Sequence, residues 1–336
     1  MENTGSTMDL GMTRRGFCLS LGAGMTILAI PAAGRAAALK KVPTSTGIDA
    51  FFAPYVVAAD RKIFEKYGLE TSYKPFDDGN VALDALLTGA SDAAPTSELG
   101  GMARWDKGGK LYVISVLNTS RTYIGLTVRE DIKKPEDLIG RTVGFPRASA
   151  GHYYFGRYTR KHKLPTDKIK VKTLQAPEMV AALERRDIDG FFLWEPWPTR
   201  AMALVKGIHV IAWSGDNDVY LQTVYNYYSQ GLVNDPPLAV TVTRALIEAT
   251  DYCMTHQEDA AKAIAKAFRT PEPDMRNFMS RVKYRMEMHK DVVPGNFREA
   301  AEFAMEQGVI KKMPDWNDFI RPQFMKEAAP DRTSGW

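Results

Sequence analysis

The sequence predicts an α/β protein of two lobes, with a ligand cleft between them and a helical segment at the C-terminal end. Short β-branched or apolar stretches alternate with helical stretches, which is typical of a largely parallel sheet. This alternation restarts near Arg141, and the chain of 336 residues is long enough for about two domains. In open sheets of this kind ligands bind outside the carboxyl ends of the strands, so we expect the site in the cleft.

The composition excludes several classes of protein. Hydrophobic residues make up 45% of the chain and charged residues 25%, which is typical of a soluble globular protein and excludes a disordered chain or a fibre. No stretch approaches the roughly 18 consecutive apolar residues of a membrane-spanning helix. The net charge of +4 is too small to indicate a nucleic-acid partner. We therefore expect a soluble monomer that binds no nucleic acid.

Residues 1–38 have the three-part pattern of an export signal. Arg14 and Arg15 directly precede an apolar run over 17–30, and the small residues Ala36–Ala38 follow it. A twin arginine before an apolar run resembles a Tat signal, with Ala36–Ala38 as the cleavage site. The pattern predicts a periplasmic protein exported by the Tat route, and an ordinary amphipathic N-terminus is the alternative.

The first lobe is expected over 39–140, completed by 229–325. Pro54 opens a helix after the first strand, and Gly68 ends it. The strands of this lobe are expected at 41–48, 69–76, 91–95, 111–117 and 122–128. Further helices are expected at 81–88 and 99–107, with a short one from 135.

The second lobe is expected over 141–228, where the same alternation is repeated. Its strands are expected at 142–145, 169–174, 191–194 and 209–213. Its helices are expected at 149–162, 177–186 and 196–206, each opened by a serine or a proline, which favour the first positions of a helix. Residues 223–228 are extended and are expected to cross back to the first lobe.

From residue 236 onward the sequence predicts helices and no strand. They are expected at 238–255, 258–268, 273–288 and 297–308. A segment without strands of its own must pack on one of the lobes, and packing on the first makes the second lobe an insertion. Residues 326–336 are expected to form a tail.

Four segments, in their order and spacing, resemble one protein family. The most specific is 134–144, with the sequence KPEDLIGRTVG, and the others are 58–70, 82–92 and 181–197. They resemble the substrate-binding proteins of ABC importers of the nitrate, sulfonate and taurine type, which are related to binding proteins for thiamine-pyrimidine precursors. The resemblance covers roughly 40–320. It implies a type II periplasmic-binding fold that closes on a small-molecule ligand and delivers it to a permease with its ATPase subunits.

The loops that open the first-lobe helices hold the first candidate ligand-binding residues. In the family that the sequence resembles, the loop of Phe51 and Phe52 contacts the ligand, and aromatic faces can stack on a planar group. Thr96 and Ser97 begin a helix whose free N–H groups form a natural anion site. Glu98 would repel an anion unless it faces away, and facing inward it would favour a ligand with amino groups. Packing under a helix and simple N-capping are the structural alternatives.

Two further loops supply candidate residues. Asn118 and Arg121 follow the fourth strand of the first lobe, and the Arg121 guanidinium could pair with a carboxylate or a sulfonate through two N–H groups. In the second lobe, Ser149, His152 and Tyr153 lie where small neighbouring residues let the backbone approach a ligand. A solvated arginine and a helix cap are the structural alternatives.

The last candidates follow later strands. Trp194 and Glu195 lie at a strand-to-helix turn, where an indole can stack on a ligand and a carboxylate can accept from a donor. Tyr225 lies on the segment that returns to the first lobe. Packing against the following helix is the structural alternative.

No motif in the sequence indicates catalysis, a cofactor or a metal site. The nucleophile elbow G-x-S-x-G, the phosphate loop G-x-x-x-x-G-K-[ST] and the metal motifs H-E-x-x-H and C-x-x-C are all missing. With 5 histidines in the chain, none placed beside another, a metal role for His152 is not expected. We therefore expect a binding protein rather than an enzyme, with no cofactor and no metal.

The ligand is expected to be a small organic anion, such as a sulfonate or carboxylate with or without an aromatic group, or a nitrate-like oxyanion. One alternative is a pyrimidine or another nitrogenous precursor. Glu98 and Glu195 would then accept hydrogen bonds from its amino groups. An enzyme on the same two-lobed fold is a second alternative, because fold does not fix function. A ligand-sensing subunit of a membrane receptor is a third.

Overall fold

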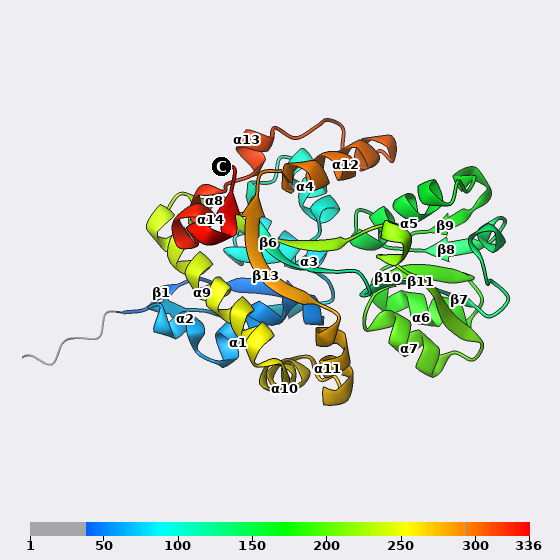
Figure 1. The fold of residues 1–336 in the computed structure, drawn as a ribbon, viewed down its shortest axis with the longest axis horizontal. Helices are drawn as coiled ribbons and strands as arrows, with labels where there is room; N and C mark the ends of the chain where they lie inside the picture. Colours follow the sequence, from blue (N-terminus) through cyan, green and yellow to red (C-terminus); the bar gives the residue numbers. More distant parts are fainter. Residues whose placement is uncertain (1–37, 292) are drawn as a thin grey trace, which may run out of the picture. The chain divides into compact units, whose positions relative to one another are not determined.

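The computed structural model describes residues 38–291 and 293–336 (Figure 1). The expected export signal at 1–38 therefore lies outside the described residues, apart from Ala38. Within the described part of the chain, no helix is both long and apolar enough to cross a membrane.

A seven-stranded sheet forms the core of the first lobe, here called the large lobe. In spatial order its strands are β14 (Thr333–Ser334), β13 (Lys283–His289), β6 (Leu111–Ser120), β12 (Gln222–Ser229), β5 (Ala93–Thr96), β2 (Thr44–Gly47) and β4 (Tyr73–Phe76). β2 pairs in parallel with β4 and β5, whereas β12 is antiparallel to β5 and β6. The sheet is mixed rather than largely parallel, because the chain leaves the lobe after β6 and returns in the opposite direction through β12.

A five-stranded sheet forms the core of the second lobe, here called the small lobe. In spatial order its strands are β11 (Ile208–Trp213), β7 (Ile124–Arg129), β10 (Gly190–Trp194), β8 (Thr142–Gly144) and β9 (Lys170–Lys172). β8 pairs in parallel with β9 and β10, and β7 is antiparallel to both of its neighbours. Every residue of β10 is buried, which confirms the buried strand expected at 191–194. A separate parallel pair consists of β1 (Lys40–Lys41) and β3 (Leu69–Glu70).

Helices cover both sheets. Those before β6 are η1 (Ala50–Phe52), α1 (Ala53–Asp60), α2 (Ile63–Lys66), α3 (Gly79–Leu87) and α4 (Glu98–Asp106). Those of the small lobe are η2 (Pro135–Leu138), α5 (Ala150–Lys161), η3 (Thr166–Lys168), α6 (Ala176–Glu184) and α7 (Trp197–Leu204), and η4 (Asp216–Asp218) lies on the returning crossing. In Figure 1, α5 lies on one side of the small sheet and α6 and α7 lie on the other.

The C-terminal segment packs on the large lobe. Its helices are α8 (Gln230–Val233), α9 (Pro236–Thr255), α10 (Gln257–Phe268), α11 (Glu272–Ser280), α12 (Val293–Glu306), α13 (Trp316–Phe319), α14 (Gln323–Ala328) and η5 (Pro330–Arg332). α9 lies along α1 and β13, and α10 lies along α1 and α11. The long helix α9 is capped by Asp235, whose carboxylate accepts from the Leu238 N–H at 3.1 Å.

The strands divide between the lobes at other positions than the expected boundaries at 140 and 228. β7, expected in the first lobe, pairs with β10 and β11 in the small sheet. β12, expected within 141–228, pairs with β5 and β6 in the large sheet. The chain therefore crosses at 121–123 and returns at 214–221. The restart of the alternation at Arg141 marks a loop inside the small lobe, because strand pairing across the chain and not local composition defines a lobe.

The expected helix over 273–288 is wrong in its second half, and so is the expectation that the C-terminal segment has no strand. α11 ends at Ser280 and strand β13 follows. In β13, Tyr284, Met286 and Met288 are buried and the residues between them are more exposed, which is the period-two alternation of a strand. β13 pairs antiparallel with β6, a partner far away in the sequence.

The residues expected to form a tail at 326–336 are part of the fold. Helix α14 reaches into this range, and Ala329 directly after it is buried. Strand β14 then pairs in parallel with β13 through Thr333 and Ser334. The chain end is thus held by both an apolar contact and a backbone ladder.

Ion pairs between α5 and α12 connect the two lobes. Arg157 Nη1 lies 2.6 Å from Glu299 Oε2, and Arg160 Nη2 lies 2.7 Å from Glu306 Oε2. Just before α5, Arg147 Nη2 donates to two backbone carbonyl oxygens that follow the end of α12, at 3.0 and 2.9 Å. These pairs are well exposed to solvent, so water and salt weaken them.

Candidate ligand-binding site

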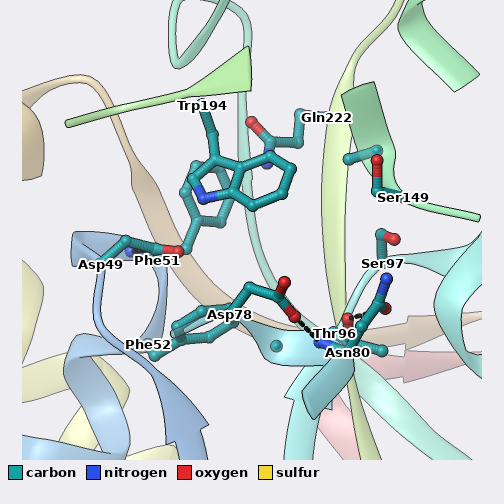
Figure 2. A pocket seen from close by; sticks show the side chains of 12 residues that line it. Asp49, Phe51, Phe52, Asp78, Asn80, Thr96, Ser97, Ser149, Trp194 and Gln222 are labelled. Carbon is teal, nitrogen blue, oxygen red and sulfur yellow. Dashed lines mark hydrogen bonds between the residues drawn. The ribbon is translucent and has the colours of Figure 1, made fainter. Parts of the chain in front are cut away.

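A small cavity lies between the lobes, and we call it the cleft cavity (Figure 2). Its lining residues come from the ends of several strands and the helices that follow, and they are Asp49, Phe51, Phe52, Asp78, Gly79, Asn80, Thr96, Ser97, Ser149, Ala150, Trp194 and Gln222. Ser149, Ala150 and Trp194 belong to the small lobe and the other residues to the large lobe or its returning strand. The free volume is about 30 Å³, room for about two water molecules at roughly 10–15 Å³ each.

Three helices begin at the cleft cavity. Asp78 caps α3, and its Oδ1 accepts from the backbone N–H groups of the two residues that follow Gly79, at 2.7 and 3.0 Å. Ser149 caps α5 and accepts from the His152 N–H at 3.2 Å. Ser97 occupies the same position at α4, but its side chain makes no capping hydrogen bond. The start of α4 therefore keeps first-turn N–H groups and a hydroxyl that can bind an anion.

Two buried carboxyl groups face the same cavity. Asp49 caps η1, with Oδ1 accepting from the Phe51 N–H at 2.8 Å. Burial is the main cause that raises the pKa of Asp49, to about 8, and burial also raises the pKa of Asp78. None of the twelve lining residues is basic. At neutral pH the Asp49 carboxyl is therefore mostly protonated, and it can donate a hydrogen bond to an anionic group.

Aromatic rings form another part of the lining. Figure 2 shows Phe51, Phe52 and Trp194 on one side of the cavity, with Ser97 and Ser149 across from them. The Phe51 ring meets the Tyr123 ring edge-on at 4.4 Å between centroids. Behind it, Asn118 Nδ2 donates to the Phe51 carbonyl oxygen at 2.6 Å. The aromatic wall is therefore fixed from behind, which favours a ligand with an apolar or planar part.

A hydrogen bond beside the cavity joins one lobe to the other. Asn80 Nδ2, at the start of α3, donates to the Ala148 carbonyl oxygen in the loop before α5 at 3.1 Å. Asn80 Oδ1 in turn accepts from the Thr96 hydroxyl at 3.2 Å. This pair of bonds connects three lining segments, so movement of one lobe changes the geometry at the others.

The structure brings together six of the thirteen candidate residues predicted from the sequence. Those that line the cleft cavity are Phe51, Phe52, Thr96, Ser97, Ser149 and Trp194. Three other candidates, Glu98, Arg121 and Tyr153, line a second cavity near the crossing segments. Arg121 Nη1 is already paired with Asp218 Oδ1 at 2.6 Å, and its side chain is mostly exposed.

The remaining four candidates lie outside both cavities. Asn118 contacts the backbone of Phe51 as described, and Tyr225 accepts from Asn296 at 3.3 Å. The His152 ring stacks on Phe145 at 4.8 Å between centroids. Burial lowers the pKa of His152 to about 4, so the ring is neutral at physiological pH.

Glu195 is fully buried and belongs to an ion pair between the lobes. Its Oε1 lies 2.8 Å from Arg281 Nη1, and its two oxygens accept from the Thr199 hydroxyl and N–H at 3.0 and 3.1 Å. Its acceptor capacity is thus used by the protein. A ligand amino group would have to break this pair to reach it.

Asp49, Asp78, Asn80 and Gln222 line the cavity without having been singled out as ligand contacts. The sequence contained a signal for the two aspartates, because an Asp directly before a helix is a preferred cap. A capping residue marks the start of a helix, but it does not show which cavity its side chain also lines. Gln222 begins β12 and had no signal; its Oε1 is buried with no hydrogen-bond partner among the described residues.

The described residues contain no group of three or more His, Cys, Asp or Glu side chains that could hold a metal ion. The groups that the cleft cavity offers to a ligand are helix N–H groups, carboxyls and aromatic faces.

Comparison with solved structures defines the class of fold. The periplasmic aliphatic sulphonate binding protein of Escherichia coli superposes with a TM-score of 0.73, at 19% identity, covering 84% of this chain and 92% of that one. The periplasmic nitrate-binding protein of Synechocystis PCC 6803 superposes with a TM-score of 0.74, at 15% identity, covering 87% and 89%. The chain has the periplasmic binding protein fold, with a cavity between two α/β lobes. This confirms the expected fold class.

Sequence comparison gives the family. Residues 50–269 match the model of the NMT1-like family, and the chain belongs to that family. A 29% identity over 144 residues relates it to the taurine-binding periplasmic protein of Escherichia coli, covering 42% of this chain and 44% of that protein. The match thus spans less than half of that relative's length. The predicted resemblance to nitrate-, sulfonate- and taurine-type binding proteins is confirmed.

These relatives are named as binding proteins and not as enzymes.

Proposed function

We propose that this protein is the periplasmic substrate-binding component of an ABC importer. It captures a small organic anion, a sulfonate or carboxylate, or a nitrate-like oxyanion, and delivers it to a permease with its ATPase subunits. The family and the names of its relatives support the class of function. The observation that carries the ligand class is the uncapped start of α4 at Ser97, inside a cavity lined by both lobes.

An oxyanion at Ser97 would complete the start of α4. The first N–H groups of a helix have no partner within it, and the helix dipole favours negative charge there. The small cavity volume favours a compact head such as a sulfonate, carboxylate or nitrate. Lobe closure supplies Ser149 and Trp194 from the other side, so a bound anion would stabilise the closed arrangement.

The carboxyls of Asp49 and Asp78 are compatible with this ligand class. Asp49, with a pKa raised by burial to about 8, donates a hydrogen bond to an anion when protonated. If the ligand also carries an ammonium group, as taurine does, the same carboxyls can ionise and bind it. A zwitterion would therefore use the helix start and the acidic side of the cavity together.

A second candidate is a neutral or cationic nitrogenous ligand, such as a pyrimidine precursor. The observation that favours it is the lining itself, with two aspartates, the unpartnered Gln222 Oε1 and no basic residue. Glu98 and Glu195 are not placed to receive amino groups in this cavity, so Asp49 and Asp78 would take that role.

The test is a thermal-shift and calorimetric titration of the purified protein with taurine, alkanesulfonates, aromatic carboxylates, nitrate and aminopyrimidines. A ligand at about 100 times its Kd adds about 2.7 kcal/mol of stability, which raises Tm clearly. The Trp194→Ala variant should lose about 2 kcal/mol of binding free energy, roughly 30-fold in Kd, because it removes a buried aromatic face. Trp336→Ala, outside the cavity, is the matched control.

Binding of a sulfonate, carboxylate or nitrate that Trp194→Ala weakens and Trp336→Ala does not is the expected result. Binding of aminopyrimidines alone would replace the first ligand class by the second. No binding by any compound, or equal losses in both tryptophan variants, would contradict the assignment of the site.

A further inference from the structure

A second cavity lies beside the segments that cross between the lobes, and we call it the hinge cavity. It has a free volume of about 240 Å³, larger than the cleft cavity. Its lining residues come from both lobes and from the crossings, and they are Glu98, Arg121, Tyr153, Arg157, Asp218, Val219, Tyr220, Leu221, Thr223, Asn296 and Glu299. Ser97 lines the cleft cavity and Glu98 lines the hinge cavity, so the start of α4 separates the two.

The basic residues of the hinge cavity are already paired with acidic ones that line the same cavity. Arg121 lies 2.6 Å from Asp218, and Arg157 lies 2.6 Å from Glu299. Glu98 has no basic partner within hydrogen-bond distance among the described residues. The lining charges therefore leave one negative charge, that of Glu98, when this carboxyl is ionised.

Glu98 is the buried polar group that lacks a full set of partners. Its side chain is 2% exposed. The Tyr220 hydroxyl donates to Oε1 at 2.9 Å, and Oε2 has no hydrogen-bond partner in the described part of the chain. A buried carboxylate oxygen without a donor is costly, so a donor brought by a ligand would be favourable.

Two aromatic rings stand beside this carboxyl. Tyr153 and Tyr220 meet edge-on with 5.1 Å between ring centroids, and both line the cavity together with Glu98. Aromatic faces combined with a carboxylate form the usual surroundings of a bound ammonium group, since the ring faces are electron-rich. An anion would instead meet Glu98 with no free basic group to balance it.

We propose that the hinge cavity is a second binding site, for a small organic amine whose ammonium group contacts Glu98 against Tyr153 and Tyr220. The cavity volume has room for the short alkyl chain of such an amine. Burial raises the pKa of Glu98 to about 7, and a bound ammonium favours the ionised carboxylate. The proposal does not depend on which ligand the cleft cavity takes.

The position of the hinge cavity couples it to the cleft cavity. Tyr153 and Arg157 come from α5 in the small lobe, while Glu98 and Asn296 come from α4 and α12 in the large lobe. The site is therefore complete only when the lobes have the arrangement seen here. An amine bound there stabilises that arrangement, and by linkage it raises the affinity of the cleft cavity for its own ligand.

The test is titration of the full chain with ethylammonium chloride, followed by Tm and calorimetry, against sodium chloride at equal ionic strength. The expected result is a saturable rise in Tm below about 10 mM, the range of a Kd near 1 mM. Glu98→Gln keeps the shape and removes the charge, and it should weaken binding by about tenfold or more. Glu272→Gln, an acid that lines neither cavity, is the control that should leave it unchanged. Asp49→Asn tests instead whether the amine binds in the cleft cavity.

Tyr153→Leu is the second variant, which tests the aromatic wall without altering Glu98, and it should weaken ethylammonium binding several-fold. No saturable effect, or a Kd unchanged by both Glu98→Gln and Tyr153→Leu, would overturn the proposal. Loss of binding in Asp49→Asn alone would also overturn it, because the amine would then occupy the cleft cavity. That last outcome would support a nitrogenous cleft ligand, so the two proposals fail separately.

Discussion

Two pairs of adjacent residues, Ser97–Glu98 at the start of α4 and Trp194–Glu195 at the end of β10, have the same arrangement in the two lobes. In each pair the first residue lines the cleft cavity and the carboxylate that follows is buried elsewhere. The carboxylates differ in their partners. Glu195 receives an arginine, a hydroxyl and an N–H group, whereas Glu98 receives a single tyrosine hydroxyl.

This difference shows that burial alone does not tell a structural carboxylate from one that is available to a ligand. The partner of Glu195 is Arg281, which reaches it from the other lobe and also stacks on the Trp213 ring at 4.9 Å. No comparable base within the described residues reaches Glu98 Oε2. Glu195 therefore helps to connect the lobes, whereas Glu98 keeps an oxygen that can accept a hydrogen bond from a ligand.

The largest expected effect is on stability, from removing the base beside Glu195. Arg281→Met leaves a buried charge without its partner, which costs about 3–5 kcal/mol of unfolding free energy. Arg276→Met is the matched control, because its pairs with Glu258 and Glu272 are exposed and should contribute less than about 1 kcal/mol. Urea unfolding measures both. If both variants lost a similar amount of unfolding free energy, the pair of Glu195 with Arg281 would be no stronger than an exposed pair. Glu195 would then not differ from Glu98 in the way described.

A smaller effect is expected in the pH dependence of stability. Burial raises the pKa of Glu98 from 4.5 to about 7, so between these values the unfolded state ionises while the folded state keeps its proton. This contribution to stability is present below pH 4.5 and is lost as the pH rises to about 7, by roughly 3 kcal/mol at most. Glu98→Gln lacks it.

The measurement is the difference in unfolding free energy between Glu98→Gln and the unchanged protein, taken from pH 4.5 to pH 8. Subtraction cancels the contributions of Asp49 and Asp78, whose pKa values burial also raises. The difference should shift in favour of the variant as the pH rises. A difference that is flat with pH would mean that Glu98 is already balanced by a partner.

The smallest effect is expected at Arg121, the residue that sequence reasoning assigned to the anion. Its pair with Asp218 is mostly exposed and faces the hinge cavity. Arg121→Ala should change stability by less than about 1 kcal/mol. It should also leave the affinity for the cleft ligand within about twofold, which calorimetry can measure. A large loss of that affinity would place the anion at Arg121 and not at the start of α4.

Local patterns predicted the alternation of strands and helices, and the loops at the strand ends that line the cleft cavity. They failed where the outcome depends on distant partners. β13 carries a strand alternation in Tyr284, Met286 and Met288, but its pairing with β6 is not visible in the local sequence. The lobe boundaries failed for the same reason, since a lobe is defined by which strands pair.

The same limit explains why only some of the candidate residues line the cleft cavity. Thr96 and Trp194 end strands, Ser97 follows one, and all three line the cleft cavity. Ser97 is the cap of α4 and has an extended backbone, whereas Glu98 is the first helical residue. Their side chains lie in different places, and Glu98 lines the hinge cavity rather than the cavity that Ser97 lines. The helical pattern of a sequence does not show toward which cavity a given side chain points.

The exposed pairs between α5 and α12 have a consequence for how the arrangement of the lobes responds to salt. Arg157 and Arg160 hold Glu299 and Glu306 across the lobes, in contact with solvent. At physiological ionic strength charges are screened beyond about 8 Å, and the screening tightens as salt rises. A higher salt concentration thus weakens these pairs and makes the arrangement of the two lobes described above less stable.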